Sequence, residues 1–392
     1  MAIEVRQIVS RAELEECYDL WTTVFPEERW FFQERLDEDR TYHTETTWAA
    51  WVDGVMAAAI QIFPYWARCG EAQVRVGGIG SVATLPRYRH QGLAQLILRQ
   101  QASWMVARGY DLSLLYTNIP GFYAQLGWRS LPEGECRRFN PDRVLAEPAS
   151  SIDIERGDLE RDYTVLSAIY GDFSAMVPFS RVRLLTFWED SVRWGRRNAR
   201  NVWIARRAGK PVGYLLARQN QTGEMSGVEC VYRLAHPDCA LPLFHAYLRQ
   251  RVEKTPVVIR LPHGHALSRY GEPVLEPSDT MWRLMNPVQL LHRIRPELNR
   301  RWAAQDALRP TVLALAVGSD ILLRVKTGSG GVDVEALDAS HLSIDGMVSL
   351  TPDEFLAILI GGVNERSPAF SHEVLRILFP PSTPFLWEGD HF

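Results

Sequence analysis

Residues 82–94 constrain the fold of this chain more than any other part of the sequence. Residues 73–85 predict a strand, and after Pro86 the apolar residues recur with helical spacing as far as Gly109, which is placed to end a helix. The loop between them contains Arg, His and Gly, and it leads straight into the first helical turn, where backbone N–H groups have no partners within the helix. Such groups converge on one point, so the sequence predicts a loop that can bind a pyrophosphate.

The flanking segments predict a mixed α/β unit around this loop. A helix is expected over residues 11–25, and two strands follow that are joined at Asp53-Gly54, a dipeptide that suits a tight hairpin because it tolerates positive φ. A further strand is expected over residues 112–116, after the helix. The order strand, loop, helix, strand is typical of an α/β fold.

Two further segments follow a break at residues 146–151. The second segment repeats the order of the first, with two helical stretches, a hairpin at 208–210, a strand over 226–235 and a helix over 241–253. Its loop before that helix, AHPDCALP, lacks the basic glycine pattern, so we expect a degenerate copy without the chemistry of the first. From about Asn286 the pattern predicts a small α+β unit: a helix over 288–295, strands over 311–317, 321–326 and 341–345, and a helix over 351–361.

Length and composition exclude several classes of protein. With 392 residues, 46% of them hydrophobic, the chain can form two or three cores at roughly 150 residues per domain. Lys and Arg number 43 against 47 Asp and Glu, and the net charge of -4 argues against a general binder of nucleic acid or of membranes. No apolar stretch reaches the roughly 18–20 residues of a membrane span, and the amino end lacks a secretory pattern. Five cysteines without a CxxC pair fit a reducing compartment, so a soluble cytoplasmic protein is expected.

Two motifs give the chain a resemblance to a known superfamily. Residues 89–94, Arg-His-Gln-Gly-Leu-Ala, fit the pattern Arg/Gln-x-x-Gly-x-Gly/Ala, which resembles the acyl-coenzyme A signature of the GNAT acetyltransferases. After the next predicted strand, residues 118–128, NIPGFYAQLGW, resemble the Phe-Tyr-x-x-x-Gly-Phe element of the same superfamily. The order and spacing of the two motifs favour an acetyltransferase.

Over its full length the chain is similar to the Eis family of N-acetyltransferases. The similarity rests on VATLPRYRHQGLA, IPGFYAQLGW, MWRLMNPVQLL and the ending LFPPSTPFLWEGDHF. It implies a mixed α/β and α+β fold, with two tandem GNAT acyltransferase folds followed by a sterol-carrier-protein-like α+β domain. The implied limits are 1–147 for a catalytic, acetyl-CoA-binding domain, 148–285 for a degenerate GNAT domain, and 286–392 for the domain that delivers the C-terminal carboxylate. The family is described as hexameric, so a homo-oligomer is expected.

The resemblance also implies roles for particular residues. Tyr123 is expected to protonate the departing thiolate as general acid, since a phenol with a pKa near 10 keeps its proton at neutral pH; a packed core aromatic is the alternative. The terminal carboxylate of Phe392 is expected to act as general base, and no metal is expected to take part. Acetyl-CoA, the cosubstrate, is expected to bind residues of both motifs: Val82, Ala83, Thr84, Arg89, His90, Gln91, Gly92, Leu93, Ala94, Gln95, Asn118 and Ile119.

The acceptor is expected to be a primary amine on a cationic molecule, either an aminoglycoside-like compound or a lysine side chain. Glu27, Glu28 and Trp30 are candidates for lining an acidic, aromatic pocket, although a solvated helix face with an aromatic core stripe would produce the same pattern. Some members of the family carry an acid at the penultimate position, where this chain has His391, so Asp390 is the nearest anionic candidate. The amine is expected to attack directly, in a ternary complex with enzyme and acetyl-CoA.

Two other functions remain compatible with the sequence. The chain could be a lipid-binding or scaffolding protein with vestigial acetyltransferase domains, or an N-acyltransferase that uses a longer acyl-CoA. Residues 193–200 are basic with an interleaved Trp, a pattern that suits a phosphate but is more typical of a solvated helix end. The sequences His263-Gly-His265 and His236-Pro-Asp-Cys239 have metal-binding residue types without a second matching pair, so we assign no metal to them.

Overall fold

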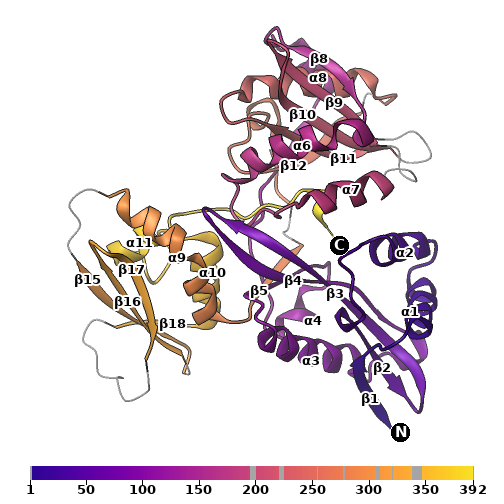
Figure 1. Ribbon diagram of the computed structural model, residues 1–392, viewed down its shortest axis with the longest axis vertical. Helices are drawn as coiled ribbons and strands as arrows, with labels where there is room; N and C mark the ends of the chain where they lie inside the picture. Colours follow the sequence, from indigo (N-terminus) through magenta and orange to yellow (C-terminus); the bar gives the residue numbers. More distant parts are fainter. Residues whose placement is uncertain are drawn as a thin grey trace.

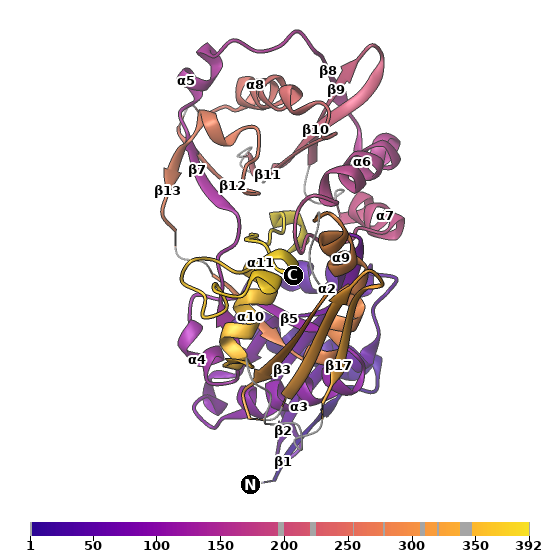
Figure 2. The same ribbon diagram turned by 90° about the vertical axis from the view of Figure 1, so that its left-hand side faces the viewer.

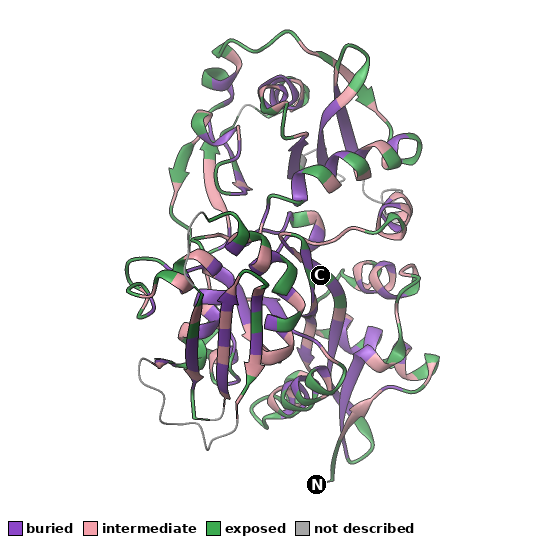
Figure 3. Cartoon of the chain, turned by 60° about the vertical axis from the view of Figure 1, so that its left-hand side comes forward, coloured by how far each residue is buried: buried purple, intermediate pink, exposed green. Residues whose placement is uncertain are grey.

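The chain forms three lobes, each built around its own β-structure, as Figure 1 shows. The computed structural model describes residues 2–194, 200–219, 225–253, 255–276, 279–305, 310–319, 321–337 and 347–391. We call the lobes first, second and third in the order in which the chain enters them. Figure 3 shows that the buried residues follow the strands and the inner sides of the helices, with exposed residues in the outer loops.

The first lobe is a seven-stranded sheet with helices on both faces. Its strand order is β1-β2-β3-β4-β5-β14-β6, and the only parallel pair among these strands is β4 with β5. Neighbouring residues of β2 face opposite sides, so Trp51 packs with the helices α1 and α2 while Ala50 packs with α3. The elements are β1 Ile3–Gln7, α1 Arg11–Val24, α2 Arg29–Asp37, β2 Thr47–Val52, β3 Val55–Cys69, β4 Ala72–Thr84, α3 Leu93–Ala107, β5 Leu112–Tyr116, α4 Pro120–Ala124, β6 Arg129–Ser130 and β14 Thr280–Leu284.

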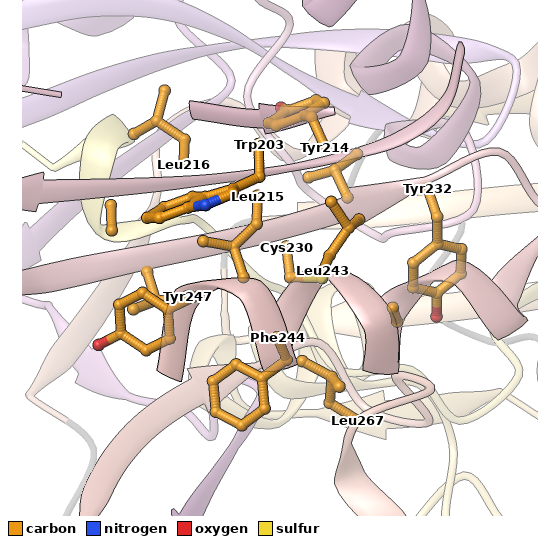
Figure 4. Close-up of a cluster of buried hydrophobic side chains, with 14 of the residues drawn as sticks. Trp203, Tyr214, Leu215, Leu216, Cys230, Tyr232, Leu243, Phe244, Tyr247 and Leu267 are labelled. Atoms are coloured by element: carbon orange, nitrogen blue, oxygen red, sulfur yellow. The ribbon is translucent and has the colours of Figure 1, made fainter. Parts of the chain in front are cut away.

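The second lobe repeats the beginning of the first. Its four-stranded sheet has the order β11-β10-β9-β8, and a separate three-stranded sheet has the order β12-β7-β13. Helix α8 packs on β9 and β10, where Phe244 and Tyr247 stack on each other among buried side chains of both strands (Figure 4). The elements are β7 Glu135–Phe139, α5 Pro141–Ala146, β8 Asp153–Gly157, α6 Leu159–Ser174, α7 Leu185–Trp194, β9 Arg200–Arg207, β10 Lys210–Gln219, β11 Met225–Tyr232, α8 Ala240–Gln250, β12 Val257–Leu261 and β13 Glu272–Val274.

The first two lobes exchange a strand. β7 follows β6 along the chain but pairs with β12 and β13 of the second lobe. β14 follows β13 but lies between β5 and β6 of the first lobe, where Trp282 is fully buried. A strand that follows the first lobe along the chain therefore completes the second lobe, and a strand that follows the second lobe completes the first. The domain limits of 1–147 and 148–285 remain a prediction, and the exchange carries β7 and β14 across them.

The third lobe packs a four-stranded sheet of order β17-β16-β15-β18 against helices. The predicted helix over 288–295 is longer in the structure, because α9 continues through Pro296 to bury Leu298 and Trp302. The predicted strand over 341–345 lies outside the described residues. The elements are α9 Pro287–Ala303, β15 Thr311–Val317, β16 Ile321–Gly328, β17 Gly331–Ala336, β18 Val348–Leu350, α10 Pro352–Gly361 and α11 Glu373–Leu378. Within the described ranges no helix, α9 included, is long and apolar enough to cross a membrane.

The C-terminal segment leaves α11 and returns to the junction of the first two lobes (Figures 1 and 2). The N–H of Ser382 still donates to the carbonyl of Gly361 in the third lobe. Phe385 and Trp387 then enter the core of the second lobe, and Leu386 lies in the core shared by the first and third lobes. This segment therefore contacts all three lobes before the chain ends.

The strand exchange makes a prediction about the isolated first segment. Residues 1–147 expressed alone lack β14, so β5 and β6 lose the strand between them and the buried Trp282 is missing from the core. We expect this fragment to show no cooperative thermal unfolding by circular dichroism, while the full chain shows one. A sharp unfolding transition of the fragment would contradict the importance of the exchanged strand.

Candidate active site

The two parallel strands of the first lobe separate toward their carboxyl ends. Their pairing runs from Val76 opposite Leu112 to Ile79 opposite Leu115 and stops there. β4 continues to Thr84, with a positive φ of 50° at Ser81, whereas β5 ends after one more residue. Beyond Ile79, β4 is therefore paired only with β3 in the described sheet, and we call the opening between its last residues and β5 the β4–β5 gap.

The loop that follows β4 is exposed and begins α3 without a side-chain cap. Arg89 folds back, and its Nε donates to the carbonyl of Thr84 at 3.3 Å. His90 and Gly92 both have positive φ, 62° and 77°, and Gly92 is the N-cap of α3. A Cβ added to Gly92 would meet no atom within 4 Å. The N-terminal end of α3 is thus open to an anionic group, which its N–H groups and helix dipole favour.

The predicted cofactor residues lie on the two sides of this gap. Val82, Ala83 and Thr84 form the end of β4, and the residues from Arg89 to Gln95 form the loop and the first turn of α3. Asn118 and Ile119 are exposed in the loop after β5. The fold therefore brings both sequence motifs to one opening in the sheet.

Tyr123 lies in the short helix α4, beside the same opening. Tyr123 is only 6% exposed and belongs to the apolar cluster that contains Leu93 and is contacted by Val82 and Ala94. Phe122 packs edge-on against it with the ring centroids 4.9 Å apart. Burial raises the pKa of Tyr123 to about 12, so the phenol keeps its proton at neutral pH.

The end of the chain reaches the β4–β5 gap. The ring of His391 stacks on Tyr116, the last residue of β5, with centroids 3.9 Å apart and planes inclined by 24°. Burial lowers the pKa of His391 to about 4, so the imidazole is neutral at pH 7. Phe392, the predicted general base, lies outside the described residues.

A buried ionic network holds this end in place. Arg183 donates from Nε to Asp390 at 2.8 Å and contacts Glu229 through both terminal nitrogens at 2.7 Å. Burial disfavours its charge, but Asp390 and Glu229 still raise the pKa of Arg183 well above its ordinary value. Arg181 donates to the carbonyl of Asp390 at 3.2 Å. The carboxylate of Asp390, a predicted contact for the acceptor, is therefore already paired with Arg183.

Glu133 provides a second anchor that the sequence did not reveal. One of its carboxylate oxygens accepts the N–H of Leu386 at 2.9 Å, and the other accepts the hydroxyl of Thr280. Burial raises the pKa of Glu133 to about 7. The next residue, Gly134, donates its N–H to the carbonyl of Pro384 at 3.1 Å. No local pattern marks Glu133, since its partners lie far away in the sequence.

The predicted acceptor residues near α2 are less organised. Glu27 and Glu28 are exposed ahead of the helix, and Trp30 is 40% exposed in its first turn. A cavity of about 350 Å³ lies between the first and second lobes, lined by residues that include Tyr65, Trp66, Arg181, Phe187 and Asp190. None of Glu27, Glu28 and Trp30 lines this cavity.

The C-terminal segment borders the corresponding opening of the second lobe. β11 and β12 belong to different sheets, and a cavity of about 500 Å³ between them is lined by Phe385, Trp387 and Glu388. Helix α8 begins after buried Cys239 instead of an open glycine loop. The start of α8 therefore differs from the open glycine loop at the start of α3, and the absence of a coenzyme site in the second lobe stays a prediction. Among the described residues no group of three or more His, Cys, Asp or Glu side chains is arranged to hold a metal.

Comparison with known proteins identifies the first lobe. Residues 4–131 match a family described as an acetyltransferase (GNAT) domain. No curated protein matches the chain. The chain is therefore an enzyme that carries a GNAT-type N-acetyltransferase domain, and domains of this type use acetyl-CoA and an amine acceptor.

Solved structures with the same architecture cover the whole chain. A GCN5-related N-acetyltransferase from Anabaena variabilis ATCC 29413 is 15% identical with a TM-score of 0.76, and both chains are covered completely. A GCN5-related N-acetyltransferase from Kribbella flavida is 15% identical with a TM-score of 0.71, covering 100% of this chain and 98% of that one. Eis1 from Mycobacterium abscessus is 16% identical with a TM-score of 0.67, again over both full chains. At these identities the similarity concerns the fold.

The open N-terminal end of α3 leads to a testable prediction, and a second glycine of similar conformation provides the control variant. Gly92→Ala should weaken acetyl-CoA binding about tenfold, the loss of roughly one charge-assisted hydrogen bond, because the added methyl lies where the phosphate must approach the backbone. Gly209 in the second lobe has a similar φ of 75° and equally open surroundings, so Gly209→Ala carries the same backbone strain. Titration calorimetry should show normal affinity for that variant. Equal affinities of the two variants would show that the loop does not contact the coenzyme.

Proposed function

We propose that this chain transfers acetyl from acetyl-CoA to a primary amine by direct attack in a ternary complex. The observation that carries the proposal is the convergence of the open N-terminus of α3, the end of β4 that no longer pairs with β5, and Tyr123 on the β4–β5 gap. Acetyl-CoA supplies an acetyl group already activated as a thioester. The amine therefore needs orientation and proton transfer more than a protein nucleophile.

The loop and β4 supply binding and polarisation in this proposal. Residues from His90 to Gln95 hold the pyrophosphate through backbone N–H groups at the start of α3. Backbone N–H groups of residues 82–84 face the acetyl carbonyl and stabilise the charge that develops on its oxygen during attack. Arg89 adds a positive charge at the edge of the loop, and Asn118 and Ile119 contact the coenzyme from the other side of the gap.

Proton transfer is assigned to Tyr123 and to the chain end. The phenol of Tyr123 is protonated at neutral pH because its pKa is raised, and it donates this proton to the departing thiolate. The terminal carboxylate of Phe392, with an unperturbed pKa of about 3.3–3.7, is ionised at pH 7 and accepts the ammonium proton directly or through water. The stacking of His391 on Tyr116 and the pairing of Asp390 with Arg183 support this assignment, because they fix the preceding residues at the gap.

Membership of the Eis family, a sterol-carrier-like third lobe, a hexamer and a cytoplasmic location are part of the same proposal. The sequence motifs and the full-length similarity in fold to Eis1 support the first two, whereas the hexamer follows only from the family resemblance and the cytoplasmic location only from the composition of the sequence. The acceptor of Eis-like sequences is expected to be cationic, but Asp390 is paired with Arg183, and Glu27 and Glu28 stay exposed. We therefore propose a primary amine as the reacting group and do not extend the proposal to an aminoglycoside.

Tyr123→Phe tests the general acid. The phenyl ring keeps the packing of Tyr123 in its cluster, so the melting temperature should stay within a degree or two, whereas kcat should fall by about 100-fold. Thiol release from acetyl-CoA measures the rate, and calorimetry checks that acetyl-CoA still binds. Tyr163→Phe, a half-buried tyrosine of the second lobe, is the matched control. Unchanged kcat in Tyr123→Phe would remove the proposed role, and an intact chain without affinity for acetyl-CoA would favour the scaffolding alternative.

An extension at the carboxyl end tests the general base. One glycine added after Phe392 moves the terminal carboxylate by about one residue length, roughly 3.5 Å, which exceeds the tolerance of a proton transfer. We expect turnover to fall at least about tenfold while thermal stability is retained, since a positioned base contributes this much or more. A glycine added before Met1 should leave turnover unchanged. Full turnover of the C-terminally extended chain would assign the base elsewhere.

A further inference from the structure

Two strand edges of the second lobe border one cavity. β11 is the end strand of its four-stranded sheet, β12 is the end strand of its three-stranded sheet, and the two lie next to each other in Figures 1 and 2. The cavity of about 500 Å³ between them is lined by residues 226–228 of β11 and 257–260 of β12, which are consecutive along each strand. In the described sheets neither edge pairs with a further strand. Each edge therefore presents backbone N–H and C=O groups beside the cavity.

The C-terminal segment forms a wall of this cavity without adding a strand to either sheet. Phe385 and Trp387 line the cavity, and both belong to the core of the second lobe. Two N–H groups of the segment are used elsewhere: that of Phe385 donates to the carbonyl of Pro178 at 3.2 Å, and that of Leu386 donates to Glu133 at 2.9 Å. The segment therefore places aromatic side chains beside the two strand edges and leaves the edges themselves available.

The cavity adjoins the β4–β5 gap at two points. His391 lines the cavity, and its ring stacks on Tyr116, the last residue of β5, with the centroids 3.9 Å apart. Asp279 also lines the cavity, and its carbonyl accepts the N–H of Thr117, the residue after β5, at 2.8 Å. A molecule held in the cavity therefore lies beside the end of β5, on the side of the gap that carries Asn118.

One polar atom of a residue that lines the cavity lacks a partner. The Nε2 of His391 is buried, and within the described part of the chain it has no hydrogen-bond partner. The imidazole is neutral at pH 7, because burial lowers the pKa of His391 to about 4, so this atom offers an N–H or a lone pair according to the tautomer. A buried polar group without a partner costs free energy, which a hydrogen bond to a molecule in the cavity would recover.

The charges that line the cavity balance each other. Arg251 and Arg260 stand against Asp279 and Glu388. Arg260 contacts Asp279 at 3.3 Å, and Arg251 donates to the carbonyl of Thr255 at 2.9 Å. A molecule with several phosphates would call for a positive lining, and a polycation would call for a negative one. The balanced lining instead suits neutral polar groups such as peptide bonds.

We propose that the cavity between β11 and β12 binds the acceptor as an extended peptide, with its primary amine directed past His391 into the β4–β5 gap. In recognition of this kind, backbone hydrogen bonds to a strand edge supply affinity and neighbouring side-chain pockets supply selectivity. The volume of about 500 Å³ lies within the roughly 300–1,000 Å³ of small ligand sites, so a short segment fits. The amine belongs to a lysine side chain or to the free amino end of the peptide. The proposal rests on the proposed acetyl transfer and names the class of acceptor.

Matched acceptors with backbones of different length test the proposal by thiol release from acetyl-CoA. In one series N-acetyl-Ala-Ala-Lys-Ala-Ala-amide is compared with N-acetyl-lysinamide, and in the other Ala-Ala-Ala-Ala-amide is compared with alaninamide. We expect kcat/KM to be about 10- to 100-fold higher for the peptide in at least one series, as a few backbone hydrogen bonds would give. The series that responds identifies the amine, and methylation of the backbone nitrogens of that peptide should remove the advantage. Equal values of kcat/KM in both series would overturn the proposal.

A variant of β12 locates the preference. Val258 lines the cavity and is 43% exposed, so Val258→Trp fills part of the cavity and should bring the ratio of kcat/KM between the peptide and the single-residue acceptor close to one. The melting temperature should change little, because Val258 lies outside the buried core. Val312→Trp makes the same change at a valine of β15 that is 64% exposed, and it should keep the ratio of the unmodified chain. An unchanged ratio in Val258→Trp would refute the site.

Binding of a peptide without an amine provides a readout that does not need turnover. In N-acetyl-Ala-Ala-norleucine-Ala-Ala-amide the lysine is replaced by norleucine, and calorimetry should detect its binding to the full chain and not to Val258→Trp. If this binding is found but no amine is acetylated, the peptide site stands and the proposed acetyl transfer fails. If N-acetyl-lysinamide is acetylated but the peptides have neither advantage nor affinity, the transfer stands and the peptide site is wrong. If the full chain binds two molecules of acetyl-CoA and Val258→Trp binds one, the cavity holds coenzyme, which also refutes the peptide site.

Discussion

The exchange of β7 and β14 is the constraint on which the remaining structure depends. Each of the first two lobes receives one strand from the other, so neither sheet is complete in a continuous segment of the chain. β14 contributes fully buried Trp282 to the core that joins the first and third lobes. The exchange therefore fixes the junction of the lobes, and the C-terminal segment lies at this junction.

The C-terminal segment uses this junction to reach the β4–β5 gap. Its buried ion pair between Asp390 and Arg183 adds little net stability by itself, because desolvation of both charges offsets most of their attraction. Its value lies in position, since a carboxylate that must meet one buried guanidinium can occupy one place only. Glu133 acts in the same way on Leu386. Two polar anchors thus hold a segment whose apolar residues alone would tolerate sliding.

Local patterns in the sequence predicted the strand, loop and helix that form the candidate site of the first lobe. The pairings between segments that are far apart in the sequence could not be predicted. The strand, basic loop and helix around Gly92 depend on residues that are close in sequence, and the comparison confirms an acetyltransferase domain there. The continuation of α9 through Pro296 could not be predicted, because the burial of Trp302 overrides the cost of the missing N–H. The strand exchange was also missed, since the sequence shows which strands exist but not which partners they choose. The roles of individual site residues remain predictions.

The buried arginine of the second lobe illustrates what the fold adds to composition. The net charge of -4 spreads over the whole chain and marks no single site. Only the junction of the lobes places the carboxylates of Asp390 and Glu229 against the guanidinium of Arg183. The local field in a buried junction depends on the nearest charges far more than on their sum, so the net charge of a chain does not predict it.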